Sequence, residues 1–332
     1  MKISIGYRDD NQPPGLRAEE VPLQFREPYV EVGYRKPYQP LTFYLKSFFQ
    51  IHNESLNVWT HAIACIAIVF QGIRLCSMID MERDPYAPMF RMFLISSVTY
   101  LFLSACAHLF QSINEIGHHV CFFIDYMGVS IYCFAAGMAQ VHFCSLPWVY
   151  NLLQGFYVPL HWLLSFLVCF CCSYSKYRYK RPYPFARKVW QMSSVAAGYI
   201  VAILPIFTRL LFQGFSIFHD IAMFYHVIQV ACFLIGSFFF AAPFPQKFSP
   251  GNFDIVGHGH QLFHIFMALV SYTEAEAVYR DYIDRRNVYS SLFTPTPSLV
   301  YGYFILLVVA NFTVVIVLGH KVKARLDREK EE

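Results

Sequence analysis

Charged residues are scarce in this 332-residue chain. Only 14% of its residues are Asp, Glu, Lys or Arg, whereas 56% are hydrophobic. An ordinary soluble domain carries about 25% charged residues. A soluble fold of this composition would leave much apolar surface in contact with water. The scarcity of charge therefore excludes an ordinary soluble domain and indicates an integral membrane protein.

Three further features are missing. Cysteines outside the apolar runs are scarce, because nearly all of the ten cysteines lie within those runs, which argues against a disulfide framework. The first twenty residues contain no apolar run, so we expect no cleavable signal peptide and insertion driven by the spans themselves. The basic residues form no separate patch, and we expect no nucleic-acid partner.

What the chain has in abundance is long apolar runs. A helix needs about 20 residues to cross a bilayer, and eight runs reach that length. The seventh is the weakest, because Glu274 and Glu276 lie in its last turns. The composition predicts an all-α integral membrane protein with eight spans, at approximately residues 59–79, 90–111, 121–142, 149–172, 189–211, 219–241, 258–279 and 299–319.

Lys and Arg predict the orientation of these spans, because cytosolic loops carry an excess of both. The N-terminal tail holds seven, and the loop "YSKYRYKRPYPFARK" between the fourth and fifth runs holds six. With eight spans, 19 of the 26 basic residues fall on the side of the two termini, so we expect both termini in the cytosol. The expected units are a cytosolic segment 1–58, a seven-span core 59–279, an extracellular loop 280–298, an eighth span 299–319 and a charged cytosolic tail 320–332.

Ionisable side chains inside spans are costly and usually functional. His260 and His264 are four residues apart, so they share one helix face. That spacing suits two imidazoles on one metal ion, and equally a polar contact between helices. His108 ends the second run, with Ser104 one turn earlier on the same face. Asp125 is a carboxylate within the third run, and it needs a cation or hydrogen-bond donors nearby.

A fourth polar group opens the first run. Glu54, Asn57 and His61 are spaced i, i+3, i+7 and share a face of the helix. Helix capping would account for polar residues at the start of the helix, but not for His61 a turn deeper. We predict either support of a neighbouring site or a contact between helices.

The predicted topology puts all four groups in the cytosolic leaflet, which favours one shared site. Three histidines, His108, His260 and His264, would supply three ligands to Zn²⁺ and leave a fourth position for water, the pattern of catalytic zinc. Neutral imidazole favours zinc over magnesium or calcium. Asp125 would hold the water or accept its proton, and Ser104 would help to orient it.

At these residues the chain resembles a known family. "ExxNxxxH" begins at Glu54, "SxxxH" at Ser104, and "PGxFDxxGxGHQLFH" at Pro250, with "REPYVEVGYR" upstream. The chain is similar to the progestin and adipoQ receptors, related to hemolysin III and the alkaline ceramidases, from about Val21 to the end of the seventh run. The resemblance implies a seven-helix core with a cytosolic N terminus and zinc on the three histidines, with Asp125 on the zinc-bound water. The short N-terminal tail and the eighth run are typical of the membrane progestin receptor branch.

Two functions follow from the resemblance. The first is a plasma-membrane receptor for a progestin such as progesterone, with rapid non-genomic signalling and inhibitory G proteins as partners. The alternative is a zinc-dependent lipid amidohydrolase that cleaves a ceramide-like amide, with steroid as a modulator. An ordinary heptahelical G-protein-coupled receptor fits poorly, because eight spans with a cytosolic N terminus give the wrong topology.

Overall fold

The structure is a computed structural model that describes residues 15–213 and 220–331. Within these residues the regular secondary structure is helical, apart from one isolated β-bridge between Leu16 and Tyr34. The short helices are α1 (Leu41–Ser47), α5 (Pro147–Leu153) and α10 (Arg286–Leu292). The long helices are α2 (Ser55–Cys76), α3 (Ala87–Phe110), α4 (Glu115–Ala139) with the π-helical turn η3 (Gln140–Cys144), α6 (Tyr157–Arg178), α7 (Phe185–Gln213), α8 (Ile221–Ala241), α9 (Gly259–Asp284) and α11 (Pro297–Glu331).

Seven of the described helices are long and apolar enough to cross a membrane, namely α2, α3, α4 with η3, α6, α7, α8 and α11. The chain is therefore a multi-pass membrane protein. Helix α9 covers the seventh predicted run, yet it is not among these seven. Its 26 residues include Glu274, Glu276 and Asp281, and these acids lower its hydropathy. The eight-span reading stays a prediction.

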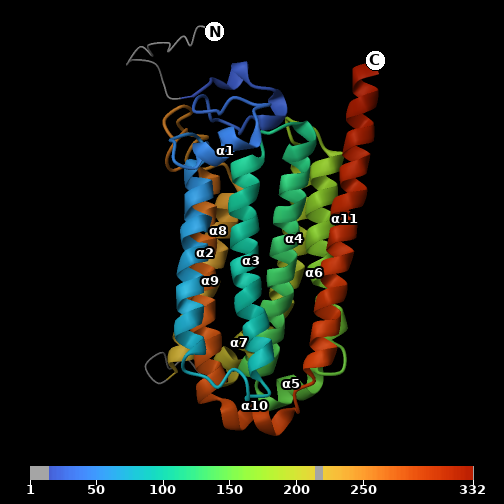
Figure 1. Ribbon diagram of the computed structural model, residues 1–332. Helices are drawn as coiled ribbons and strands as arrows, with labels where there is room; N and C mark the ends of the chain where they lie inside the picture. Colours follow the sequence, from blue (N-terminus) through green and yellow to red (C-terminus); the bar gives the residue numbers. More distant parts are fainter. Residues whose placement is uncertain (1–14, 214–219, 332) are drawn as a thin grey trace.

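The long helices form a closed bundle. Helices α2, α3, α4, α6 and α7 pack in chain order, α8 packs against α7 and α9, and α9 returns to α2. Helix α11 lies outside this ring against α4 and α6 (Figure 1). Large apolar side chains such as Ile63 and Phe70 of α2 stay more than half exposed, as expected for a surface that faces lipid rather than water.

The two ends of the bundle carry different short helices, and we name each end by its short helix. At the "α1 end" lie α1 and the C-terminal end of α11, while α10 lies at the opposite "α10 end" (Figure 1). The segment before α1 is fastened to the α8–α9 loop, because the Asp254 carboxylate accepts hydrogen bonds from the backbone N–H groups of Glu31 (3.0 Å) and Val32 (2.7 Å). Gly33 has φ +89°, a left-handed backbone conformation that favours glycine, and a Cβ there would also lie 2.4 Å from Ile255 Cδ1.

The helix boundaries depart from the predicted runs at several points. The fourth run, 149–172, is divided into α5 and α6, which are separated by a turn at residues 154–156 that contains Gly155, a weak helix former. Helix α4 begins before residue 121 because the Asn114 side chain accepts the Gly117 N–H at 2.7 Å and caps it. Region 280–298 contains the last turn of α9 and all of α10, and the tail from 320 continues α11 as helix to Glu331.

Candidate metal centre

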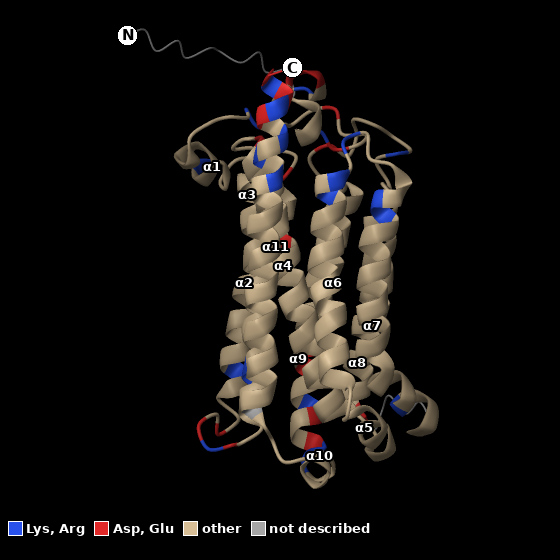
Figure 2. Ribbon diagram, turned by 90° about the vertical axis from the view of Figure 1, so that its right-hand side faces the viewer, with Lys and Arg blue, Asp and Glu red and all other residues tan. Residues whose placement is uncertain are grey.

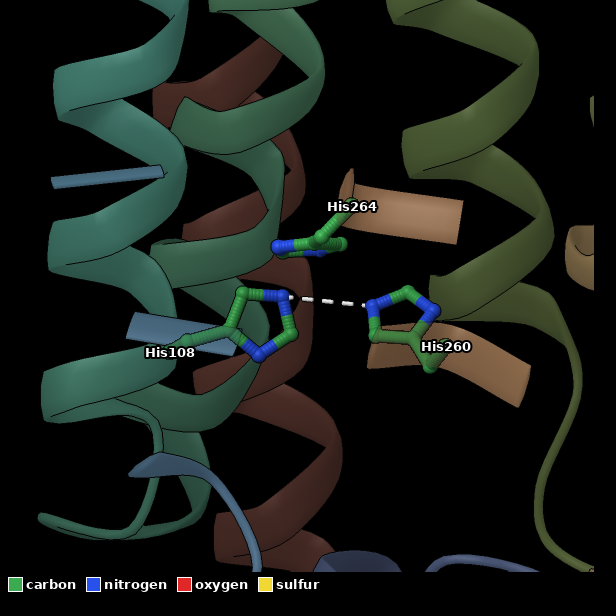
Figure 3. A group of neighbouring side chains, drawn as sticks. All are labelled: His108, His260 and His264. Atoms are coloured by element: carbon green, nitrogen blue, oxygen red, sulfur yellow. Dashed lines mark hydrogen bonds between the residues drawn. The ribbon is translucent and has the colours of Figure 1, made fainter. Parts of the chain in front are cut away.

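The structure brings three of the predicted residues together at the α1 end. His108 lies in the last turn of α3, and His260 and His264 occupy the first two turns of α9. His108 and His264 are buried, with 2% and 1% of their surface exposed. In Figure 3 the three rings turn toward one another. One nitrogen from each lies within 4.8 Å of the other two, so the group could hold a metal ion.

The spacing of the nitrogens fits a tetrahedral site. Nε2 of His260 lies 3.3 Å from Nε2 of His108. Imidazole binds zinc at about 2.0–2.1 Å, and tetrahedral angles then put two such nitrogens about 3.3–3.4 Å apart. The ring centroids of His264 lie 4.7 Å from those of both His108 and His260. Little rearrangement is needed for all three rings to face one ion.

The outer nitrogens of two rings are already bonded in the manner of metal ligands. Nδ1 of His108 lies 2.7 Å from the Glu54 carboxylate, and Nδ1 of His264 lies 3.1 Å from the Asn57 carbonyl. Both partners are acceptors, so each Nδ1 carries the proton. Each Nε2 then presents a lone pair to the common centre. A carboxylate or carbonyl behind a ligating histidine fixes the ring and raises its basicity.

The polar group that opens the first predicted run, Glu54, Asn57 and His61, lies next to these histidines. Glu54 lies behind His108, and the Asn57 side chain donates to the same Glu54 oxygen at 2.7 Å. His61 stacks on His264, with ring centroids 3.8 Å apart and planes 15° from parallel. Within the described chain neither ring nitrogen of His61 has a hydrogen-bond partner. Glu54, Asn57 and His61 therefore surround two of the three histidines.

One supporting residue was not predicted as functional. Arg35 donates to the carbonyls of His108 (2.7 Å) and Leu109 (2.6 Å) and to Ser47 Oγ (2.9 Å). It thereby satisfies the free carbonyls at the C-terminal end of α3. Burial lowers the pKa of Arg35 to about 10, which leaves the guanidinium charged at neutral pH. The available signal was its position as the last residue of "REPYVEVGYR".

Asp125 and Ser104 lie at the edge of the cluster. Both are buried, at 8% and 3% exposure. The Ser104 hydroxyl lies close to the Asp125 carboxylate. The side chains of His108 and Lys176 are also near this carboxylate. Asp125 is not one of the groups whose atoms converge at ligand distance.

A second buried group of potential ligands, which the sequence analysis did not predict, lies at the α10 end. Cys144, His226 and Asp281 also converge within 4.8 Å. However, the two oxygens of Asp281 already accept from Arg209 Nη1 (2.5 Å) and His226 Nε2 (2.9 Å). Gln229 contacts the other nitrogen of His226 at 3.0 Å. The residues come from η3, α7, α8 and α9, so no short spacing in the sequence indicates them.

Fold and site define a class of protein, the multi-pass helical membrane proteins with a buried triple-histidine cluster. The family model of haemolysin-III-related proteins matches residues 49–274, and the chain belongs to this family. The chain is 36% identical to human membrane progestin receptor beta, over 93% of this chain and 88% of the receptor. It is 34% identical to mouse membrane progestin receptor alpha (93% and 89%) and to zebrafish membrane progestin receptor alpha-B (96% and 91%). The predicted membership of the progestin receptor branch is confirmed.

Proposed function

We propose that this chain is a plasma-membrane receptor for a progestin such as progesterone that mediates rapid non-genomic signalling. Similarity to membrane progestin receptors over more than nine tenths of the chain supports it most directly. A steroid is apolar, and the bundle interior is rich in aromatic side chains such as Phe90, Phe93 and Phe134, which are fully buried. An inhibitory G protein is the proposed partner at the cytosolic face.

Specific binding of tritiated progesterone tests the receptor proposal. Membranes from cells that express the chain, but no nuclear progestin receptor, should bind the label in a saturable way. Excess unlabelled progesterone should displace it, and excess cortisol should not. Membranes from untransfected cells are the control. Labelling that does not exceed the control, in a preparation where the protein is shown to be folded, contradicts the proposal.

The proposed topology has eight spans, including α9, with the α1 end in the cytosol. The basic residues support it, because they gather at the upper ends of α6, α7 and α11 in Figure 2, which is the α1 end, and cytosolic loops are enriched in Lys and Arg. Glycosylation acceptor sites placed in loops 80–85 and 180–184 test it. We expect modification in the first loop alone, and modification in the second contradicts the orientation.

The proposed cofactor is zinc, held by His108, His260 and His264. Three imidazoles, two of them with their outer nitrogens bonded to acceptors, form a donor set that favours zinc over magnesium or calcium. Bound zinc would act as a Lewis acid. Glu54 and Asn57 hold the rings in place, and Arg35 holds the end of α3 that carries His108. Metal analysis of the purified protein tests this part of the proposal.

A second candidate function is amide hydrolysis of a ceramide-like lipid. The buried pair of Asp125 and Ser104 beside His108 favours it, because a carboxylate in such a place is a suitable general base. In this role Asp125 would accept a proton from water, and Ser104 would help to orient that water. Purified protein should then cleave a short-chain fluorescent ceramide, and Asp125→Asn should abolish cleavage while metal content is retained. Asp84→Asn, a carboxylate outside the site, is the matched control, and equal loss in both variants contradicts the assignment.

A further inference from the structure

Lys176 is a buried cation without an acidic partner. It lies near the C-terminal end of α6, and only 3% of its surface is exposed. Its ammonium contacts a neutral ring nitrogen, Nε2 of His118, at 3.1 Å, and lies 3.9 Å from the centre of the Phe122 ring. Within the described chain it forms no ion pair with a carboxylate. A buried charge without a counter-ion is costly.

Several other cations lie near this ammonium. Arg181 and Arg187 both lie over the Tyr183 ring, 4.7 and 3.9 Å from its centre. Lys188 donates to the Phe240 carbonyl at 2.5 Å and lies 3.8 Å from the centre of the Phe240 ring. The carboxylates near Lys176 are Glu27 and Asp125. Glu27 is paired with Arg181, at 3.2 Å. The Nε atoms of Arg181 and Arg187 are buried without a hydrogen-bond partner in the described structure. Four cations therefore share two carboxylates, Glu27 and Asp125, and part of their donor capacity is unused.

The topology rule does not account for this arrangement. An excess of Lys and Arg in a cytosolic loop is expected, but such side chains extend into water, as Arg178 does on the exposed side of the same stretch. Lys176 points into the protein, and Arg181 keeps only 13% of its side chain exposed. The loop that predicted orientation thus contains an inward-facing basic cluster.

We propose that Lys176, Arg181, Arg187 and Lys188 form a binding site for the phosphate group of an anionic membrane lipid. A phosphate matches the guanidinium fork of Arg and the point charge of Lys. It would neutralise most of the uncompensated charge. The neighbouring residues Val189 and Trp190 are 49% and 40% exposed, and tryptophan favours the level of lipid headgroups. They place the site where a headgroup meets its acyl chains. This site is independent of the steroid and zinc proposals.

Purified protein in a neutral detergent allows a direct test with three probes. Dioctanoyl phosphatidic acid should raise the melting temperature and add one lipid mass in native mass spectrometry, and dioctanoyl phosphatidylcholine at the same concentration should do neither. Inorganic phosphate distinguishes the source of the anion. A shift as large as that from phosphatidic acid assigns the site to soluble phosphate, and a small shift assigns it to the lipid.

Variants separate a built site from general surface charge. Arg187→Gln should weaken phosphatidic acid binding about tenfold, the equivalent of one charge-assisted hydrogen bond. Arg178→Gln makes the same charge change on the exposed side and should leave binding unchanged. Lys176→Gln should also lose binding and, because it removes the buried charge, should not lower the melting temperature of the lipid-free protein. Equal binding of the two lipids, or equal losses in Arg178→Gln and Arg187→Gln, would overturn the proposal.

Discussion

The two ends of the bundle each contain a buried group of potential metal ligands, and the two groups differ in their charge balance. At the α1 end, His108 and His264 bond outward to Glu54 and the Asn57 carbonyl. Their Nε2 atoms are left for the common centre, where Nε2 of His108 lies 3.3 Å from Nε2 of His260. At the α10 end, Asp281 accepts from Arg209 and His226. There the protein supplies its own cation. Convergence of ligand atoms is thus insufficient evidence for a metal site, and the cation that the protein itself supplies distinguishes the α10 group from the α1 group.

The largest expected effect is on metal content. We expect about one zinc per chain in the wild type and less than a tenth of that in His264→Ala, because two remaining imidazoles hold zinc weakly. His226→Ala removes a buried histidine from the other cluster and should leave metal content unchanged. Mass spectrometry of the metal in purified protein measures both. An equal loss in His226→Ala would mean that the α10 end also binds an ion.

The next effect is on stability at the α10 end. Asp281→Ala leaves Arg209 buried with less compensation, and we expect a loss of about 3–5 kcal/mol in the free energy of unfolding. Replacing both partners, as Arg209→Met with Asp281→Leu, should recover part of that loss, because the carboxylate left without its partner is that of Asp220, whose side chain is 32% exposed. Denaturant melts in detergent measure it. If chelation of metal destabilises the wild type as much as Asp281→Ala does, the contrast between the two ends fails.

A smaller effect concerns the support behind His108. Glu54→Gln keeps the shape of the side chain but removes its charge, and we expect zinc affinity to fall about 10–100-fold. Competition with a chromophoric chelator measures the change. Glu82→Gln alters an exposed carboxylate in the α2–α3 loop and should not change the affinity. Unchanged affinity in Glu54→Gln would reduce Glu54 to a helix contact.

The smallest effect is a pH dependence at the α10 end. Burial opposes ionisation of Asp84, but hydrogen bonds from Arg286 and Tyr282 outweigh it and lower the pKa of Asp84 below 3.8. The lowered pKa contributes stability above the ordinary pKa, and this contribution is lost as the pH falls through the lowered value. Wild type should exceed Asp84→Asn by no more than about 1 kcal/mol at pH 7, because the pair is partly exposed to solvent. Thermal melts should show the gap closing in acid, and a constant gap would contradict this account.

The acids of the seventh run show why sequence reasoning reached some features and not others. Glu274 and Glu276 made that run the weakest, and α9 is indeed the long bundle helix that is not apolar enough to count as a span. Their partners were not predictable, because Glu274 bonds to Tyr132 and Gln140, and Gln71 donates to Glu276 from α2. These residues are distant in the chain, and only helix packing brings them together.

By itself the sequence determined the class of protein, the all-helical fold, the family and the list of candidate residues, because composition and short spacings are local properties. The tertiary structure decided which candidates meet. It put Glu54 behind His108, stacked His61 on His264, brought Arg35 to the end of α3, and left Asp125 at the edge. It also turned Lys176 inward and paired Asp281 with Arg209. These outcomes depend on how separate helices pack, since contacts between distant segments follow from the burial of whole helix faces and not from any local pattern.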